Sequence, residues 1–309
     1  MDYMKDIREI SDEQAVILWQ ASRLSLSGKY EKAPEILSVK GSVIGTLGNF
    51  SASIGKAKSK KTFNVSAIVA AALKNGTVLR YAAELPEAKR KVLYVDTEQS
   101  PHHCLNVMER IMRMAGLPDD RDNENLEFLA LRKYTPEQRI RIVEQAIYHT
   151  PNLGMVVIDG IRDMVYDINS PSESTRIRDE VMDIFNEFTR DENHAILISS
   201  HIVSDLEKLC DTIAFLHKGR LLLCEEKDAL REEYALWHGT AAQLAALDTQ
   251  VYGKRVTPYG VEALVRRDAM PAGDELAPVS IEELFVLMAS RMAKTCDLGF
   301  CKWRASHPR

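Results

Sequence analysis

The sequence lacks several features that would define its class at once. It has no uninterrupted run of about 18 apolar residues, so we expect no transmembrane helix. The first residues, Met1 to Asp6, are charged and carry no apolar segment of a signal peptide, which favours a cytoplasmic location. Only 5 cysteines occur in 309 residues, and none forms a C-x-x-C pair. This argues against a disulfide framework and against a zinc site.

A strong charge of one sign is missing as well. The formal net charge is −5, so the chain as a whole does not attract nucleic acid, and any contact with DNA would need a local basic patch. Hydrophobic residues make up 45% of the chain, which is an ordinary fraction for a globular protein with a real core. The length predicts one large or two modest domains.

What the sequence does contain is a lysine-rich segment between a strand-like run, 49–54, and a helix-like run, 63–73. In such a setting, backbone N–H groups and the positive end of the helix dipole bind an anionic group. Against the phosphate-loop pattern G-x-x-x-x-G-K-[ST], Gly55, Lys61 and Thr62 match, while Lys60 replaces the second glycine. The predicted nucleotide-binding residues are therefore Gly55, Lys56, Ala57, Lys58, Ser59, Lys60, Lys61 and Thr62.

Two of these residues have specific expected roles. Lys61 reaches the β- and γ-phosphates of ATP, and Thr62 holds Mg²⁺. The alternative is a solvated lysine-rich turn before an ordinary helix. In either case the side chains of Lys56, Lys58 and Lys60 are expected to be solvated rather than catalytic.

Strand-like and helix-like runs alternate after this segment. Apolar strand patterns occur over 91–96, 126–131, 153–159 and 195–201, with helix patterns between them. This order predicts an α/β fold, a P-loop NTPase with a mostly parallel sheet and helices on both faces. Ligand sites in such sheets lie at the carboxyl ends of the strands, where Gly55, Asp96 to Glu98, Asp159 and His201 fall.

The remaining pattern divides the chain into four parts. We predict an N-terminal helical segment over 1–35, an ATPase domain over 36–211, a small α+β extension over 212–294 and a disordered tail over 295–309. Within them we expect a strand pair at 36–46, a surface excursion at 77–90, a hairpin at 213–223, a helix at 227–237 and a last helix at 281–292.

Three residues at strand ends are candidates for the chemistry of ATP hydrolysis. Asp159 follows four apolar residues and fits an acid that holds Mg²⁺ through water; alternatively it caps a turn. Glu98 follows a strand by two residues and is the candidate for activating water; alternatively it is a solvated acid at a helix start. His201 could sense the γ-phosphate or cap the helix that follows it.

Residues 36–176 resemble the RecA-like ATPases of the RepA/DnaB helicase group. The resemblance is carried by the segment from Gly55 to Thr62, by Val95-Asp96-Thr97-Glu98 and by Val156-Val157-Ile158-Asp159-Gly160. It implies ATP and Mg²⁺ as ligands, Glu98 as the residue that activates water, and a DNA-associated ancestry on mobile elements or in replication. The departure at Lys60 bears on the loop geometry, because glycine accepts backbone torsions that lysine resists.

Residues 178–292 are similar instead to the C-terminal part of ABC-transporter ATPases. The run from Ile196 to Glu207 matches that family's switch-histidine segment, with His201 as the switch, and 213–226 and 279–288 match its C-terminal extension. The ABC phosphate loop, Q-loop, L-S-G-G-Q signature and Asp-Glu pair are all absent. Because the two resemblances meet near Thr175 to Arg178, we infer a chimera of two related families.

The sequence therefore predicts a RecA-like, ATP-hydrolysing protein. Two alternatives stay open: an ABC-type subunit that couples ATP to a membrane transporter, and a chimera that binds nucleotide without hydrolysing it. DNA binding and assembly into a homo-oligomer also stay open.

Overall fold

The computed structural model describes residues 11–30, 32–39, 41–55, 60–165, 171–190, 193–200, 210–217, 220–247, 249–271 and 275–294. The chain forms two compact units, Met1–Ala33 and Pro34–Arg309. In the first unit, α1 (Asp12–Ala21) begins with a reciprocal capping box between Ser11 and Gln14. None of the α1 side chains is buried.

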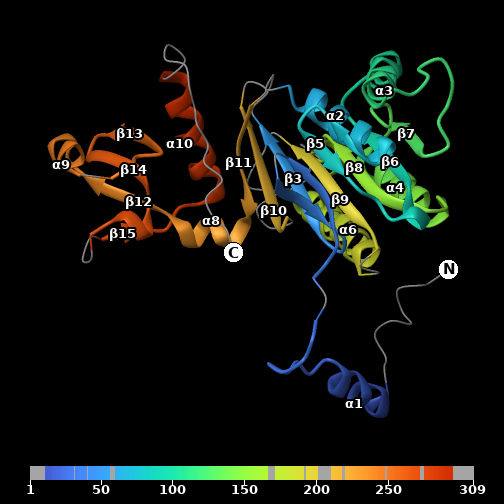
Figure 1. Ribbon diagram of the computed structural model, residues 1–309, viewed down its shortest axis with the longest axis horizontal. Helices are drawn as coiled ribbons and strands as arrows, with labels where there is room; N and C mark the ends of the chain where they lie inside the picture. The colour runs from blue at the N-terminus through green and yellow to red at the C-terminus, as the bar shows by residue number, and fades with distance from the viewer. Residues whose placement is uncertain are drawn as a thin grey trace. The chain divides into compact units, whose positions relative to one another are not determined.

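The second unit is built around a seven-stranded sheet with the order β11-β10-β3-β9-β8-β6-β7 (Figure 1). All neighbouring strands in it are parallel except β10 and β11. Its strands are β3 (Phe50–Gly55), β6 (Lys91–Asp96), β7 (Leu126–Ala130), β8 (Leu153–Asp159), β9 (Ala195–Ser200), β10 (Thr212–His217) and β11 (Arg220–Glu226). In this order β9 lies between β3 and β8.

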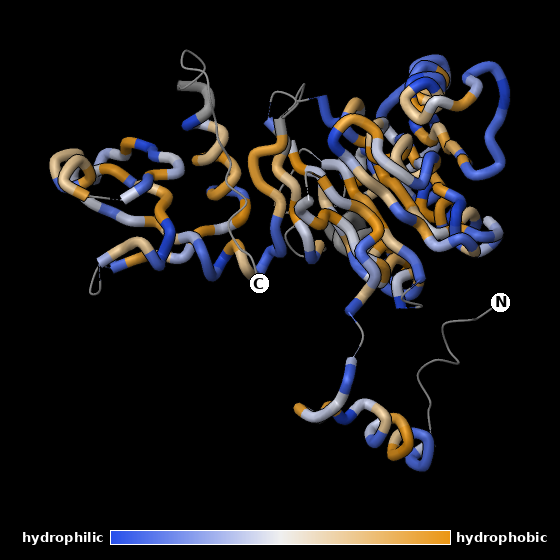
Figure 2. Tube along the Cα trace, viewed as in Figure 1, coloured by the Kyte–Doolittle hydropathy of each residue, from blue (hydrophilic) through white to orange (hydrophobic). Residues whose placement is uncertain are grey.

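Helices cover both faces of this sheet because successive strand residues point to opposite sides. On one face, Val92 and Tyr94 belong to the core that α2 (Lys61–Lys74) and α3 (Pro101–Ala115) complete. On the other face, Leu93 and Val95 belong to the core with α4 (Pro136–His149) and α6 (Pro171–Thr189). Figure 2 shows hydrophobic residues concentrated along the central strands. The predicted α/β fold with a mostly parallel sheet is confirmed.

A small antiparallel sheet of order β2-β1-β5-β4 packs against α2. It contains β1 (Glu35–Val39), β2 (Ser42–Thr46), β4 (Thr77–Val78) and β5 (Tyr81–Ala83), followed by η1 (Glu87–Lys89). The predicted pairing within 36–46 is confirmed. The prediction of a surface excursion at 77–90 is wrong, because Val78, Tyr81 and Leu85 are buried. The sequence did not predict β4 and β5 because both strands are short and have charged neighbours.

A third sheet of order β13-β14-β12-β15 follows β11. The predicted helix at 227–237 is wrong in its second half: α8 (Lys227–Glu233) ends where β12 begins. From Tyr234 the side chains alternate between two cores, which is the period of a strand. The other elements are α5 (Arg162–Val165), β12 (Tyr234–Gly239), α9 (Ala241–Ala246), β13 (Gly253–Thr257), β14 (Gly260–Arg266), η2 (Arg267–Ala269), β15 (Leu276–Ala277) and α10 (Ile281–Lys294).

The predicted hairpin at 213–223 is confirmed as β10 and β11, although β11 runs on to Glu226, and the predicted last helix corresponds to α10. The predicted tail at 295–309 lies outside the described residues.

Candidate functional site

The candidate site begins where β3 ends and α2 starts. Gly55 is the last residue of β3, and Lys61 is the first residue of α2. The Lys61 ammonium donates a hydrogen bond to the carbonyl oxygen of Gly55 over 2.9 Å. This contact joins the two ends of the predicted phosphate loop, whose intervening residues Lys56 to Ser59 lie outside the described residues.

Lys60 adopts the left-handed backbone conformation that the sequence pattern assigns to glycine. Its φ is +66° and its ψ is +33°, and no side-chain hydrogen bond caps the helix there. For a residue with a Cβ atom this conformation costs about 1–2 kcal/mol. The structure therefore keeps a glycine-like torsion at Lys60 at some cost in stability, and Lys61 and Thr62 follow it in the first turn of α2.

Asp159 is the point on which the polar groups of the site converge. The Thr62 hydroxyl donates to Asp159 Oδ2 over 2.9 Å, and the Tyr94 hydroxyl donates to the same oxygen over 3.1 Å. Tyr94 is fully buried, and its burial and the neighbouring Asp159 raise its pKa well above the usual range, so it stays a donor. Asp159 itself is 7% exposed.

Asp96 lies beside Asp159 across the β6–β8 pair and organises the loop that carries Glu98. Its Oδ1 accepts the backbone N–H groups of Glu98 and Gln99 at 3.0 and 2.7 Å. Its Oδ2 accepts the Gln99 side-chain amide at 2.7 Å. Asp96 is therefore occupied with holding the loop, and Glu98 is the carboxylate left to face the site.

Glu98 and Lys61 experience opposite electrostatic effects. Burial raises the pKa of Glu98, and the negative charges of Asp159 and Asp163 raise it further, while Lys61 opposes the change. Burial lowers the pKa of Lys61, against the attraction of Asp159 and Glu98. A carboxylate with a raised pKa is a stronger base than one with its ordinary pKa, which suits proton transfer.

A buried arginine fixes the loops around these acids. Arg139, which is 9% exposed, donates to the carbonyl oxygens of Leu131 and Arg132 at 3.0 and 2.8 Å, and to that of Asp163. The guanidinium thereby links the segment after β7 to α5, where Asp163 lies. This link sets the position of one of the charges that act on Glu98.

The structure brings Gly55, Lys60, Lys61, Thr62, Glu98 and Asp159 to one edge of the sheet. His201 lies outside the described residues, as do Lys56, Ala57, Lys58 and Ser59. Sequence reasoning missed Tyr94, because a tyrosine inside an apolar strand reads as core. It also gave no role to Asp96, although the acid-rich segment after β6 was a usable signal.

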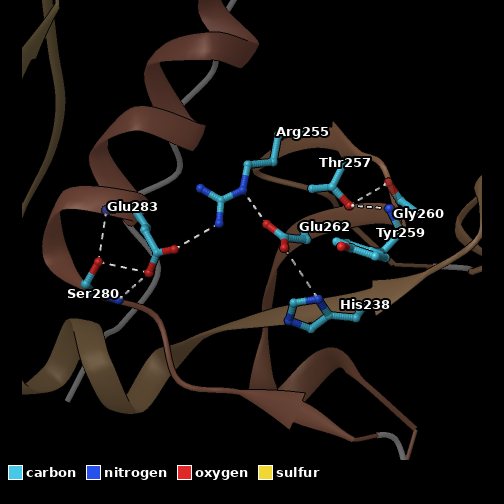
Figure 3. Close-up of polar contacts among 8 residues, drawn as sticks. All are labelled: His238, Arg255, Thr257, Tyr259, Gly260, Glu262, Ser280 and Glu283. Atoms are coloured by element: carbon cyan, nitrogen blue, oxygen red, sulfur yellow. Dashed lines mark hydrogen bonds and ion pairs between the residues drawn. The ribbon is translucent and has the colours of Figure 1, made fainter.

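A second polar cluster lies away from these residues, on the C-terminal sheet and α10 (Figure 3). Arg255 on β13 binds Glu262 on β14, and it also binds Glu283 on α10 over 2.9 Å. His238 on β12 lies 3.7 Å from Glu262. The Arg255 and His238 side chains are 43% and 50% exposed, so this cluster is partly solvated. It contains none of the residues predicted for nucleotide binding.

The donor set at the sheet edge fits a hard cation and a polyphosphate. Thr62 offers a hydroxyl oxygen and Asp159 a carboxylate oxygen, which are the ligand types that Mg²⁺ prefers. Lys61 adds a positive charge at the N-terminus of α2, where the helix dipole already favours an anion. In the part of the chain that the structure describes, the helices are too short or too polar to cross a membrane.

Comparison with known proteins agrees with this arrangement. The chain is 31% identical over 100 residues to an uncharacterized ABC transporter ATP-binding protein, YhcH, from Bacillus subtilis, covering 31% of this chain and 33% of that protein. It is 26% identical over 100 residues to a putative ABC transporter ATP-binding protein from Mycoplasma pneumoniae, covering 32% of this chain and 28% of that protein. The chain thus spans about a third of the length of these relatives.

A family model described as an AAA domain matches residues 28–203, which is more than half of the chain. The match includes β3, α2, β6, β8 and β9, the elements that form the site. The chain therefore belongs to the AAA domain family, and its central sheet is that of a P-loop ATPase domain.

Proposed function

We propose that this protein binds ATP with Mg²⁺ and hydrolyses it to ADP and phosphate. The observation that carries the proposal is the hydrogen bond between Thr62 and Asp159, 2.9 Å long, at the start of a helix that also presents Lys61. Two residues that are far apart in the chain meet where the phosphates of a nucleotide would lie. Lys61 would neutralise charge on the β- and γ-phosphates, and Thr62 and Asp159 would hold Mg²⁺, with Asp159 acting through water.

In the proposed reaction, a water oxygen forms a bond to the γ-phosphorus, and the bond to the β,γ-bridging oxygen breaks as ADP leaves. Glu98 accepts the proton of the attacking water. Its raised pKa makes it a better base, and Asp96 keeps its loop in place. When bound, Mg²⁺ supplies positive charge that offsets the negative charge of the phosphates.

Steady-state hydrolysis and nucleotide binding by the whole chain test the proposal. Glu98→Gln keeps the shape of the side chain but removes the base, so we expect kcat to fall about 100-fold or more while ATP–Mg²⁺ still binds. Glu109→Gln on α3 is the matched control and is expected to match the parent. A parent chain that does not hydrolyse ATP at all would support the alternative of an inactive nucleotide-binding protein.

A second candidate function is that of an ATP-binding subunit of a membrane transporter. The partial similarity to two ABC transporter ATP-binding proteins favours it. The missing signature motif and the glycine at position 160, where ABC enzymes have a glutamate, argue against it. ATPase activity that appears only when a membrane subunit is added would favour this candidate over the first.

The resemblance to the RepA/DnaB helicase group makes DNA a candidate partner. The change of resemblance near 175–178 affects this candidate, because it alters the part of the domain that would contact DNA. The α6 helix continues without a break across 175–178, where the resemblance changes to the ABC type, so we propose that the joined segments fold as one domain. Because the segment that carries DNA loops in the helicase group is replaced, we expect little stimulation by single-stranded DNA, even at low salt. Stimulation of roughly tenfold would show that a helicase-like coupling had survived.

A further inference from the structure

Gly160, the residue after Asp159, has no side chain at a place where none would fit. A Cβ atom there would lie 2.4 Å from Thr97 Oγ1, 2.8 Å from Glu98 Cγ and 3.1 Å from Glu98 Oε1. The φ of Gly160 is +99°, which residues with a side chain rarely adopt. Both the space and the torsion therefore require glycine.

Two residues bonded to Gly160, Thr97 and Ser199, cannot easily give way because they are buried and hydrogen-bonded, whereas Glu98 is exposed and its side chain can move. The Thr97 hydroxyl donates to the Gly160 carbonyl over 2.6 Å, and the Thr97 N–H donates to the Asp159 carbonyl over 3.2 Å. From the other side, the Gly160 N–H donates to the Ser199 carbonyl over 3.2 Å. Thr97 is 1% exposed and Ser199 is fully buried. The turn after β8 is thus held between β6 and β9.

Glu98 is consequently held from two directions. Asp96 accepts its backbone N–H, which fixes the loop, and the open space over Gly160 receives the start of its side chain. A larger residue at 160 would push the Glu98 side chain out of this space or break the bonds of Thr97. Its effect would fall on the direction of the Glu98 carboxylate and leave Lys61 and Thr62 in place.

We infer that Gly160 is a positioning residue for Glu98, and that the space that it leaves empty lets Glu98 act on water. This inference rests on the proposed function. It also has a consequence for the ABC resemblance. ABC enzymes carry a glutamate directly after the aspartate that corresponds to Asp159. Such a glutamate at position 160 would need the same space as the Glu98 side chain. The site accepts a carboxylate from the β6 loop or from the residue after Asp159, and this chain uses the first.

The test compares two glycines with positive φ. Gly116, the C-cap of α3, has a φ of +73°, but a Cβ there would meet no atom within 4 Å. Gly116→Ala therefore measures the cost of the torsion alone. We expect Gly160→Ala to lower kcat about 100-fold, as a displaced catalytic group does, with little change in Kd for ATP–Mg²⁺. Gly116→Ala should change neither quantity.

Two further variants link the effect to Glu98. In the Glu98→Gln background, Gly160→Ala should cause no additional loss of kcat, because both changes act on the same group. Thr97→Val keeps the shape of the side chain and removes its bond to Gly160, so it should also lower kcat while ATP–Mg²⁺ binding persists. If Gly160→Ala does not fold, Thr97→Val still tests whether the contact between Thr97 and Gly160 positions Glu98.

Some outcomes would overturn the inference. Parental kcat in Gly160→Ala, with kcat lost in Glu98→Gln, would remove Gly160 from the mechanism and leave the proposed function intact. Loss of nucleotide binding together with a much lower melting temperature than that of Gly116→Ala would make Gly160 a structural residue only. If Glu98→Gln keeps parental turnover, the role of Glu98 fails, and the inference about Gly160 fails with it.

Discussion

The polar cluster at the edge of the central sheet and the cluster around Arg255 on the C-terminal sheet differ in their residues and in their surroundings. At the edge of the central sheet, Asp159 is 7% exposed and accepts hydrogen bonds from Thr62 and from the fully buried Tyr94. On the C-terminal sheet, Arg255 binds two carboxylates while 43% of its side chain faces solvent. Burial raises the pKa of Glu98 in the first cluster, whereas in the second, against the effect of its burial, hydrogen bonds from Ser280 and the pairing with Arg255 lower the pKa of Glu283. The first cluster therefore favours a basic carboxylate, and the second favours ion pairs that hold α10 against the sheet.

The largest expected effect tests the buried cluster directly. Lys61→Ala removes the positive charge that would face the nucleotide in the proposed function, and we expect ATP binding to weaken by about 2–5 kcal/mol, or roughly 30-fold or more in Kd. Lys74→Ala, at the other end of the same helix, is the matched control and should bind as the parent does. Titration with a fluorescent ATP analogue measures both; equal affinities would refute the phosphate-loop assignment.

A smaller effect is expected from the hydroxyl that supports Asp159. Tyr94→Phe keeps the ring stacked on Phe128 but removes the hydrogen bond that the Tyr94 hydroxyl donates to Asp159 Oδ2. The free energy of unfolding should therefore fall by about 1–3 kcal/mol. Urea unfolding measures the loss. Tyr148→Phe, on the exposed side of α4, should be neutral. If the two variants unfold alike, the bond between Tyr94 and Asp159 has no net value.

A substitution at Lys60 is expected to raise the free energy of unfolding instead of lowering it. Lys60→Gly relieves the left-handed torsion, which costs about 1–2 kcal/mol, but glycine also loses more backbone entropy on folding. We expect a net gain in the free energy of unfolding of about 0.5–1 kcal/mol. The same urea experiment detects it, and a loss of stability would mean that the Lys60 side chain makes contacts that outweigh the strain.

The smallest effect is expected on the C-terminal sheet. Arg255→Met breaks both ion pairs, yet partly solvated pairs contribute only about 0–1 kcal/mol. The change in stability should shrink further at high salt, and ATP binding should not change. Lys254→Met, one residue earlier on the same exposed strand, is the control. A loss of ATP binding in Arg255→Met alone would show that the two clusters are coupled.

The sequence predicted the elements whose signals are periodic and the residues that follow them. Strands such as β6 and β8 read as apolar runs, and the acids at their ends, Glu98 and Asp159, lie on the same edge of the sheet for that reason. The residues it missed act through geometry. The hydroxyl of Tyr94 meets Asp159 only after β6 and β8 pair, and the space over Gly160 exists only where the β6 loop crosses the turn after β8.

Local propensity also failed where pairing decides the outcome. The segment around Tyr81 is too short and too charged to read as a strand, yet it pairs with β1 and buries its ring. At Glu233 the helix α8 gives way to β12, whose form depends on its neighbours β14 and β15. Pairing between strands that are far apart in the chain cannot be predicted from one short segment of the sequence.

The position of β3 in the sheet has a consequence for synthesis of the protein. This strand leads into the phosphate loop, but its two hydrogen-bonded neighbours are β9 and β10, whose registers pair Phe50 with Ile196 and Ser51 with Thr212. A ribosome must therefore translate past β10 before both edges of β3 can be closed. Until then the emerging chain presents the open edges of a strand that is fully buried in the finished fold, which favours aggregation. We expect ATP binding to arise on the nascent chain only after β10 has been translated, so nucleotide can stabilise the protein only from that point on.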